Sequence, residues 1–200
     1  MESAREKKRL EIILAAMKVF TEKGIDNTSM EDLARALGTT KSYFYFYFRS
    51  KEDLIVSIFQ YLKDRALEEL EERLRETDDP VRRLEIWIRE HFRQVRDNPD
   101  FLRFVYSFVF SSMAKRMNIH SSLVRKDRYF NLLNEIIRDG QRRGVFIAED
   151  VGALAYSIRG TIYGAMRYLF EEGKGESEID EVESAVLNLI MGGVVNRRSG

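Results

Sequence analysis

The chain has 200 residues, of which 44% are hydrophobic and 33% are charged, so it can bury a substantial core and is neither disordered nor collagen-like. The formal net charge is zero, so the protein as a whole is not a basic nucleic-acid binder, and the distribution of charge matters more than its sum. The absence of cysteine excludes disulfides, thiolate metal sites and cysteine nucleophiles.

The N-terminus carries no apolar signal segment, and the most apolar stretch, residues 101–114, is interrupted by Arg103 and is too short to cross a bilayer. We therefore expect a soluble, cytoplasmic protein without a membrane partner. Basic residues gather at Arg5, Lys7, Lys8 and Arg9, ahead of the first clear helical pattern. An ordinary solvated terminus explains this cluster about as well as a functional basic patch does.

Apolar residues recur at helical spacing along almost the whole chain, which predicts an all-α fold. The first helix carries an apolar stripe from Leu10 to Phe20, and Gly24 closes it as a C-cap. Thr28 and Ser29 are predicted to cap a short second helix that ends at Leu37. Further helices are predicted over residues 51–75, 80–96, 99–117, 121–143, 150–170 and 177–195. This order predicts a small N-terminal unit of three helices, residues 1–50, followed by a larger helical bundle, residues 51–200.

The stretch from Ser29 to Leu54 predicts a helix-turn-helix. Two short helices that cross steeply need a small residue at the crossing, which is Ala34. They also need a sharp turn that glycine adopts without strain, at Gly38, and a bulky apolar side chain that returns to the core, at Phe44.

The six consecutive aromatic residues from Tyr43 to Phe48 have the propensity of a strand. A helix is favoured because the run follows a helix turn directly and has no turn partner. As a helix, the run places Phe44 and Phe48 on the buried side and Tyr43 and Tyr47 on a neighbouring side.

The segment from Gly38 to Leu54, GTTKSYFYFYFRSKEDL, resembles the DNA-binding domain of the tetracycline-repressor (TetR) family. Ala15, Ala16, Phe20 and Gly24 also match that family's pattern. The resemblance covers about the first quarter of the chain. It implies a protein that reads double-stranded DNA with its second short helix, the recognition helix.

Carried over to this sequence, the resemblance implies ten DNA-binding residues. Those facing the major groove or its edge are Thr39, Thr40, Lys41, Ser42 and Tyr43, and those at the backbone are Tyr45, Tyr47, Lys51 and Thr28 or Ser29. One departure is that Phe46 stands where the family often has histidine, so an apolar contact or simple packing replaces a polar contact there.

In such proteins the remaining helices form a ligand-binding and dimerisation domain. The last helix stacks Ile179, Val182, Val186, Leu189, Ile190 and Gly193 on one face, and the preceding helix aligns Ala153, Ser157, Gly160, Thr161 and Gly164. These faces fit a homodimer through the last two helices, which suits a reader of palindromic DNA. Ordinary core packing is the alternative for the last helix.

The resemblance also implies an effector cavity between the central helices. The large aromatic, methionine and polar residues expected to line it are Trp87, His91, Phe104, Phe108, Met113, Tyr129, Tyr156, Arg159, Tyr163 and Met166. A simple core is the alternative interpretation of the aromatic and methionine stripe. His91 fits a pocket or core residue better than a metal ligand, and we expect no metal site and no cofactor.

Arg159 lies on a predicted helix that is otherwise nearly all apolar or small, which predicts burial on most sides. A buried guanidinium needs an anionic partner or a route to water. One interpretation pairs Arg159 with Asp127 or Glu135. The other has it bind the anionic head of a largely apolar ligand such as a fatty acid or an acyl thioester.

The sequence therefore predicts a repressor that binds palindromic operator DNA as a homodimer and is released by a small hydrophobic, anionic effector. The alternative is a helical protein that sequesters a hydrophobic ligand and has a vestigial DNA-binding head, against which Lys41, Tyr45, Tyr47 and Lys51 argue. We expect no enzyme, because no phosphate-cradling loop or nucleophile arrangement is present.

Overall fold

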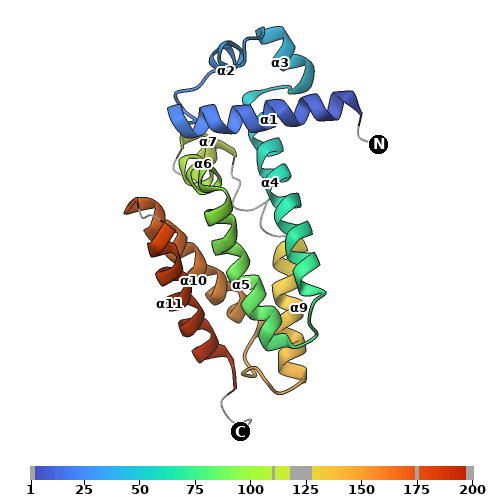
Figure 1. Cartoon of the computed structure of the whole chain (residues 1–200), viewed down its shortest axis with the longest axis vertical. Coiled ribbons are helices and arrows are strands. Elements are labelled where there is room, and N and C mark those ends of the chain that lie inside the picture. The colour runs from blue at the N-terminus through green and yellow to red at the C-terminus, as the bar shows by residue number, and fades with distance from the viewer. Residues whose placement is uncertain (1–2, 110, 118–127, 174–175, 197–200) are drawn as a thin grey trace. The chain divides into compact units, whose positions relative to one another are not determined.

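The computed structural model describes residues 3–109, 111–117, 128–173 and 176–196. All regular elements in these ranges are helices, so the predicted all-α class is confirmed (Figure 1). The helices are α1 Ala4–Lys23, α2 Met30–Ala36, α3 Lys41–Tyr47, α4 Lys51–Leu74, α5 Pro80–Asp97, α6 Pro99–Val109, α7 Ser112–Met117, α9 Arg128–Arg142, α10 Val151–Glu171 and α11 Glu176–Val194. None of these described helices is long and apolar enough to span a membrane.

The chain forms two compact units, and α4 runs from one to the other. The head unit contains the residues up to Asp64 together with 100–122, and the body unit contains 65–99 and 123–200. The predicted division at residue 50 follows the DNA-binding motif alone. The compact head also includes the first part of α4 and α6, because Phe59 of α4 packs against the rings of Phe104 and Phe108 of α6.

The three N-terminal helices begin at hydrogen-bonding caps. Ser3 and Glu6 form a capping box at α1, Ser29 and Asp32 form one at α2, and the Thr40 hydroxyl accepts a hydrogen bond from the Tyr43 N–H at α3. Because the Ser3 cap extends α1 to Ala4, the basic cluster lies within its first two turns. Our expectation that the cluster precedes the helix was wrong.

The predicted helix over residues 99–117 is two helices, α6 and α7. A side-chain cap explains the break: the Ser111 hydroxyl accepts a hydrogen bond from the Ala114 N–H at 3.2 Å. The Ser112 N–H is bound by the Asp26 carboxylate at 2.8 Å. The predicted helix over residues 121–143 is described from Arg128, the first residue of α9, and its earlier part lies outside the described residues.

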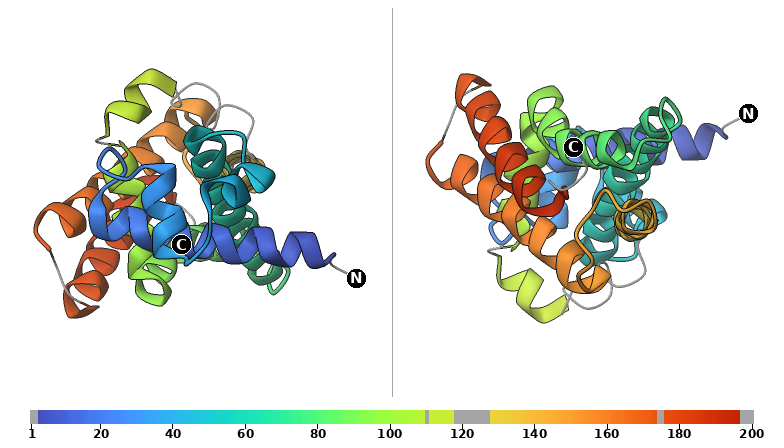
Figure 2. Two further views of the ribbon diagram at one scale, coloured as in Figure 1. Left: turned by 90° about the horizontal axis from the view of Figure 1, so that it is seen from above. Right: turned by 90° about the horizontal axis from the view of Figure 1, so that it is seen from below.

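The core of the head unit is built around large apolar side chains. Phe20, Phe44 and Leu54 are fully buried, as are Leu33 and Ile58. In the body unit α5 packs against α9 and α11, and α10 packs against the same two helices. Figure 2 shows α10 and α11 side by side in both views.

The α9–α10 connection contains a position that requires glycine. A Cβ atom at Gly140 would lie 2.0 Å from the Phe146 ring, so only glycine allows this ring to pack on α9. The N–H groups of Val145 and Phe146 donate to the Gly140 carbonyl. These contacts hold the Phe146 ring against the last turn of α9.

One side of α10 is exposed within the single chain, and its other side is buried against the body unit. Ile158, Ile162 and Met166 are buried, whereas Tyr156 and Tyr163 are exposed. Of the five small residues predicted to lie together, Ala153, Ser157, Gly160 and Gly164 are exposed, and Thr161 is partly buried.

Candidate nucleic-acid interface

The aromatic run forms the recognition helix α3 and not a strand. Phe44 and Phe48 are buried, as predicted, and anchor α3 to the head core. Thr40, Lys41, Ser42, Tyr45 and Phe46 are exposed, and Thr39, Tyr43 and Tyr47 are partly buried. The polar and aromatic side of α3 is therefore accessible to a binding partner, whereas its apolar side packs against the core of the head unit.

The turn between α2 and α3 has the geometry that the motif requires. Gly38 has a φ of 63°, in the left-handed region that glycine adopts without strain. Ala34 is 4% exposed, and its carbonyl accepts a hydrogen bond from the Thr39 N–H at 2.9 Å. A small residue at position 34 thus allows the turn to close over α2.

The ammonium of Lys41 and the hydroxyl of Tyr43 on this surface can donate hydrogen bonds. Lys41 forms an ion pair with Glu31, which raises the pKa of the ammonium. The pKa of Tyr43 is raised mainly by partial burial and to a smaller extent by its hydrogen bond with Tyr47. Both side chains therefore keep their protons at neutral pH and can donate to phosphate or base acceptors.

Two of the residues predicted to contact the DNA backbone have structural roles within the head unit. Thr28 is buried, and its hydroxyl donates to the Gly24 carbonyl at 2.7 Å, so of the pair Thr28 or Ser29 only Ser29 is exposed. The Lys51 ammonium donates to the Ile25 carbonyl and lies 5.9 Å from the centre of the Phe20 ring. Lys51 thus ties the start of α4 to the loop before α2.

Sequence reasoning missed a contact between α1 and α3. The Arg5 guanidinium lies 5.1 Å from the centre of the exposed Phe46 ring. Arg9, one turn later, lies 4.9 Å from the Phe48 ring and donates to the Ser57 hydroxyl at 2.6 Å. The sequence contains the basic cluster, but nothing in its local pattern gives the register between two helices so far apart along the chain.

Three of the predicted effector residues meet in the body unit. The Trp87 ring lies 4.4 Å from the His91 ring and 5.6 Å from the Tyr129 ring, and the indole N–H donates to the Tyr129 carbonyl. Burial lowers the pKa of His91 to about 4; its hydrogen bond with the Trp87 carbonyl opposes this, and the charge of Arg159 adds to the lowering. His91 is therefore neutral at pH 7.

Arg159 of α10 forms no ion pair with Glu135, one of the two carboxylate partners that we considered. Glu135 pairs with Arg128, and Asp127 lies outside the described residues. The guanidinium lies 4.0 Å from the centre of the Phe130 ring and 4.8 Å from that of Tyr156. Its Nε atom is buried and has no hydrogen-bond partner among the described residues.

The other predicted effector residues are dispersed. Phe104, Phe108 and Met113 belong to the core of the head unit, whereas Met166 is buried in the body unit. Tyr156 and Tyr163 are 65% and 46% exposed, which leaves their rings open to solvent or to a partner chain.

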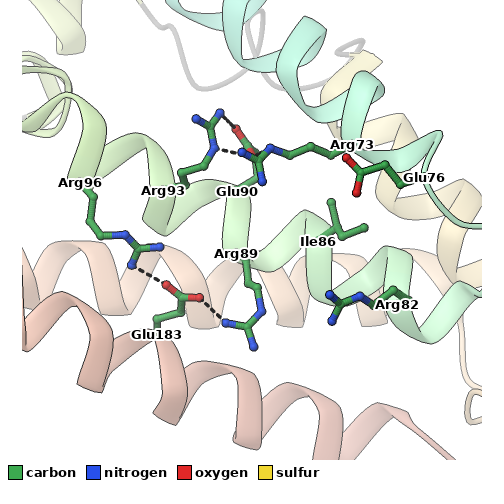
Figure 3. A pocket seen from close by; sticks show the side chains of 9 residues that line it. All are labelled: Arg73, Glu76, Arg82, Ile86, Arg89, Glu90, Arg93, Arg96 and Glu183. Carbon is green, nitrogen blue, oxygen red and sulfur yellow. Dashed lines mark hydrogen bonds and ion pairs between the residues drawn. The ribbon is translucent and has the colours of Figure 1, made fainter.

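A cavity of about 240 Å³ in the body unit is lined by charged side chains and not by the aromatic residues expected (Figure 3). Two buried carboxylates organise it. Glu183 of α11 accepts from Arg89 at 2.7 Å and from Arg96 at 2.6 Å, and Glu90 of α5 accepts from Arg93 at 2.6 Å. Because these arginines are already paired, the cluster acts as a bracket that fixes α5 to α11.

The exposed side of α10 and α11 has features of an interface. A Cβ atom at Gly160, Gly164 or Gly193 would meet nothing within 4 Å, so packing within the chain does not require glycine there. Leu189 is 67% exposed. By contrast, Ile179, Val186 and Ile190 are buried, so the predicted apolar face of the last helix is divided between core and surface.

Two family models cover most of the chain. Residues 12–58 match the model of bacterial regulatory proteins of the tetR family, and residues 77–194 match that of the tetracyclin repressor-like C-terminal domain. No group of three or more histidine or carboxylate residues placed to hold a metal ion occurs in the described parts of the chain.

Individual relatives agree with these matches. The fatty acid metabolism regulator protein of Bacillus subtilis is 26% identical over 194 residues, 95% of this chain and 97% of that protein. The uncharacterized HTH-type transcriptional regulator YvdT of the same organism is 33% identical over 128 residues, 63% of each chain. The crystal structure of FadR from Bacillus subtilis in complex with stearoyl-CoA has a TM-score of 0.80 and 24% identity, and the match covers 92% of this chain and 98% of that one.

Proposed function

Since this chain belongs to the tetR family of bacterial regulatory proteins and is a DNA-binding transcriptional regulator, we propose that it is a repressor that binds palindromic operator DNA as a homodimer and is released by an anionic, largely apolar effector. The observation that carries this proposal is the division of α3 into a buried side and an exposed side. Phe44 and Phe48 hold the helix, and Thr40, Lys41, Ser42 and Tyr45 remain available to DNA.

Sequence is read by side chains that reach base edges, and register is set by phosphate contacts. We assign the first role to Thr40, Ser42 and Tyr43 and the second to Lys41, Tyr45 and Tyr47. Tyrosine hydroxyls donate to phosphate oxygens, and their rings pack against sugars or thymine methyl groups. The contact between Lys41 and Glu31 is an exposed pair, which phosphate oxygens can replace at little energetic cost.

A dimer supplies the second recognition helix. We propose that the exposed sides of α10 and α11 form its interface, because open glycine positions let two helix backbones approach closely and Leu189 supplies apolar area. Two recognition helices read successive major grooves only if they lie about 34–36 Å apart or a multiple of that distance. An effector that changes this spacing by a small amount therefore weakens binding.

The effector site is assigned to the aromatic cluster around Arg159. The guanidinium lies near two aromatic rings, and its buried Nε has no acceptor among the described residues, so the oxygen of an anionic ligand would complete its hydrogen bonds. Neutral His91, Trp87 and Tyr129 supply an apolar environment beside it. The names of the Bacillus subtilis relatives, a fatty acid metabolism regulator and a complex with stearoyl-CoA, favour an acyl thioester or a fatty acid.

The test is a selection of DNA by the purified full chain. Sheared DNA of the source genome is passed over immobilised protein, and the retained fragments are sequenced and then challenged with stearoyl-CoA, oleate or the neutral stearyl alcohol. We expect retention of a few fragments that share a palindrome, and release by an anionic acyl compound but not by the alcohol. Binding of the acyl compounds without retention of any fragment would instead support the ligand-sequestering alternative.

A further inference from the structure

We propose that Arg5, held against Phe46 of the recognition helix, supplies an additional DNA phosphate contact from the first turn of α1. This inference rests on the proposed placement of α3 on DNA. It concerns the basic cluster whose purpose the sequence left open, and it gives Arg5 a role different from those of Lys8 and Arg9.

The four basic residues have different surroundings. Lys8 forms an ion pair with Glu11 at 2.6 Å. Arg9 donates a hydrogen bond to the Ser57 hydroxyl and lies over the Phe48 ring within the head unit. Arg5 forms no ion pair with any residue that the structure describes and is exposed. Among the described residues, no carboxylate therefore pairs with its positive charge at the place where α1 meets α3.

Phe46 gives Arg5 a defined position. The guanidinium lies 5.1 Å from the centre of the ring, a distance at which a cation is attracted to an aromatic face. The ring is itself held edge-on by Tyr47, with centroids 5.0 Å apart and an angle of 85° between the planes. Phe46 remains 63% exposed and cannot be explained by burial in the head core.

Arginine is suited to this position for two reasons. Its guanidinium stacks flat on a ring while the N–H groups at its edge stay free to donate, and this planar fork matches the geometry of a phosphate. The other side of the same α1–α3 contact is a cleft of about 280 Å³ lined by Lys8, Glu11 and Tyr43, so α1 borders the recognition helix over two turns.

The location determines which DNA group Arg5 meets. Phe46 lies in the last turn of α3, so a side chain stacked on it lies beside the helix and not at its tip. When α3 occupies the major groove, the groove is bordered by the sugar-phosphate backbone. Arg5 then neutralises one phosphate, strengthens binding to all sequences and releases one counterion equivalent.

The experiment measures the affinity of the full-length protein for a retained genomic fragment, and for an unrelated duplex, over a range of salt concentrations. The variants are Arg5→Met, Phe46→Ala and the double variant. Lys18→Met serves as the matched control, because Lys18 is an exposed cation of the same helix. Circular dichroism melting of each variant establishes that the head unit remains folded.

We expect Arg5→Met to reduce the magnitude of the slope of log affinity against log salt by about 0.9 and to weaken both duplexes several-fold. Phe46→Ala should weaken the Arg5 contact although it removes no charge. The Arg5→Met change should therefore have a smaller effect in the Phe46→Ala background than in the wild type. Lys18→Met should leave the slope near its wild-type value.

The proposal is overturned if Arg5→Met and Lys18→Met change the slope equally, or if the effects of Arg5→Met and Phe46→Ala are strictly additive. Specific DNA binding by the wild type with an unchanged slope in Arg5→Met would reject the Arg5 contact alone. Absence of any specific DNA binding by the wild type would reject both this contact and the proposed function.

Discussion

The guanidinium of Arg159 lies 4.0 Å from the centre of the Phe130 ring, and its buried Nε has no hydrogen-bond partner among the described residues. Two helices, α9 and α10, thus meet at a cation that aromatic rings attract and that forms no ion pair with a residue that the structure describes. This arrangement supports the proposal that an anionic ligand completes the site.

Arg159→Met keeps much of the bulk and removes the charge. We expect this variant to fold and to bind operator DNA with wild-type affinity, while the concentration of stearoyl-CoA or oleate that releases DNA rises at least tenfold. Fluorescence anisotropy of labelled operator measures the release. Arg138→Met, at an exposed position of α9, is the control and should respond as the wild type does. Normal release from the Arg159 variant would make this arginine structural.

Leu189 and Val186 distinguish the proposed dimer interface from the core of the body unit. Leu189 is 67% exposed and Val186 is 6% exposed on the same helix. Leu189→Arg should leave the melting temperature of the protein nearly unchanged but give monomers at micromolar concentration in sedimentation. It should also weaken operator binding by two orders of magnitude or more, because a single half-site binds weakly.

Val186→Arg should instead destabilise the fold by several kcal/mol, because it buries an unpaired charge. The burial of Val186 within the chain therefore makes it unsuitable for disrupting a dimer. A stable dimer of the Leu189→Arg variant would place the interface elsewhere.

Glu183 is predicted to contribute to stability through the bracket between α5 and α11. Replacing it by glutamine removes the buried negative charge that Arg89 and Arg96 share and leaves one acceptor oxygen in place of two. We expect a loss of about 1–3 kcal/mol in the free energy of unfolding, measured by urea denaturation. Asp180→Asn is the control, because Asp180 also contacts Arg96 but has a 70% exposed side chain; it should cost less than about 0.5 kcal/mol. Equal effects of the two substitutions would contradict this role.

His91 predicts a pH dependence of stability. Burial, together with the charge of Arg159, lowers its folded-state pKa to about 4 from an unfolded value near 6.5, so the unfolded chain binds the proton more readily. Stability from this residue is fully present above pH 6.5 and is lost as the pH falls toward 4, by about 3 kcal/mol. His91→Gln should be less sensitive than the wild type over this range in urea denaturation. Identical pH profiles would show that His91 is accessible to protons in the folded state.

Local sterics explain why the helix-turn-helix could be predicted from the sequence. The crossing at Ala34, the left-handed turn at Gly38 and the return of Phe44 to the core lie within a few residues of one another, so the sequence pattern nearly determines their geometry. The same holds for the caps at Ser29 and Asp150.

Features that depend on contacts between distant segments could not be predicted. The break between α6 and α7 involves Asp26, which captures the Ser112 N–H from a loop far away in the sequence. The exposed side of α10 is the side left uncovered when the helix packs against α9 and α11, which come from other parts of the sequence. Apolar periodicity identifies a helix face but does not decide whether the chain itself or a second copy covers it.

The most direct test of the account is a hydroxyl-radical footprint of the full-length protein on a retained genomic fragment. A homodimer that reads DNA with α3 predicts two protected segments of related sequence, with centres about one helical turn apart or a multiple of it. Thr40→Ala and Tyr43→Ala should alter which sequences are protected, whereas the spacing of the segments should stay constant. A single protected segment, or no protected segment at any protein concentration, would contradict the account.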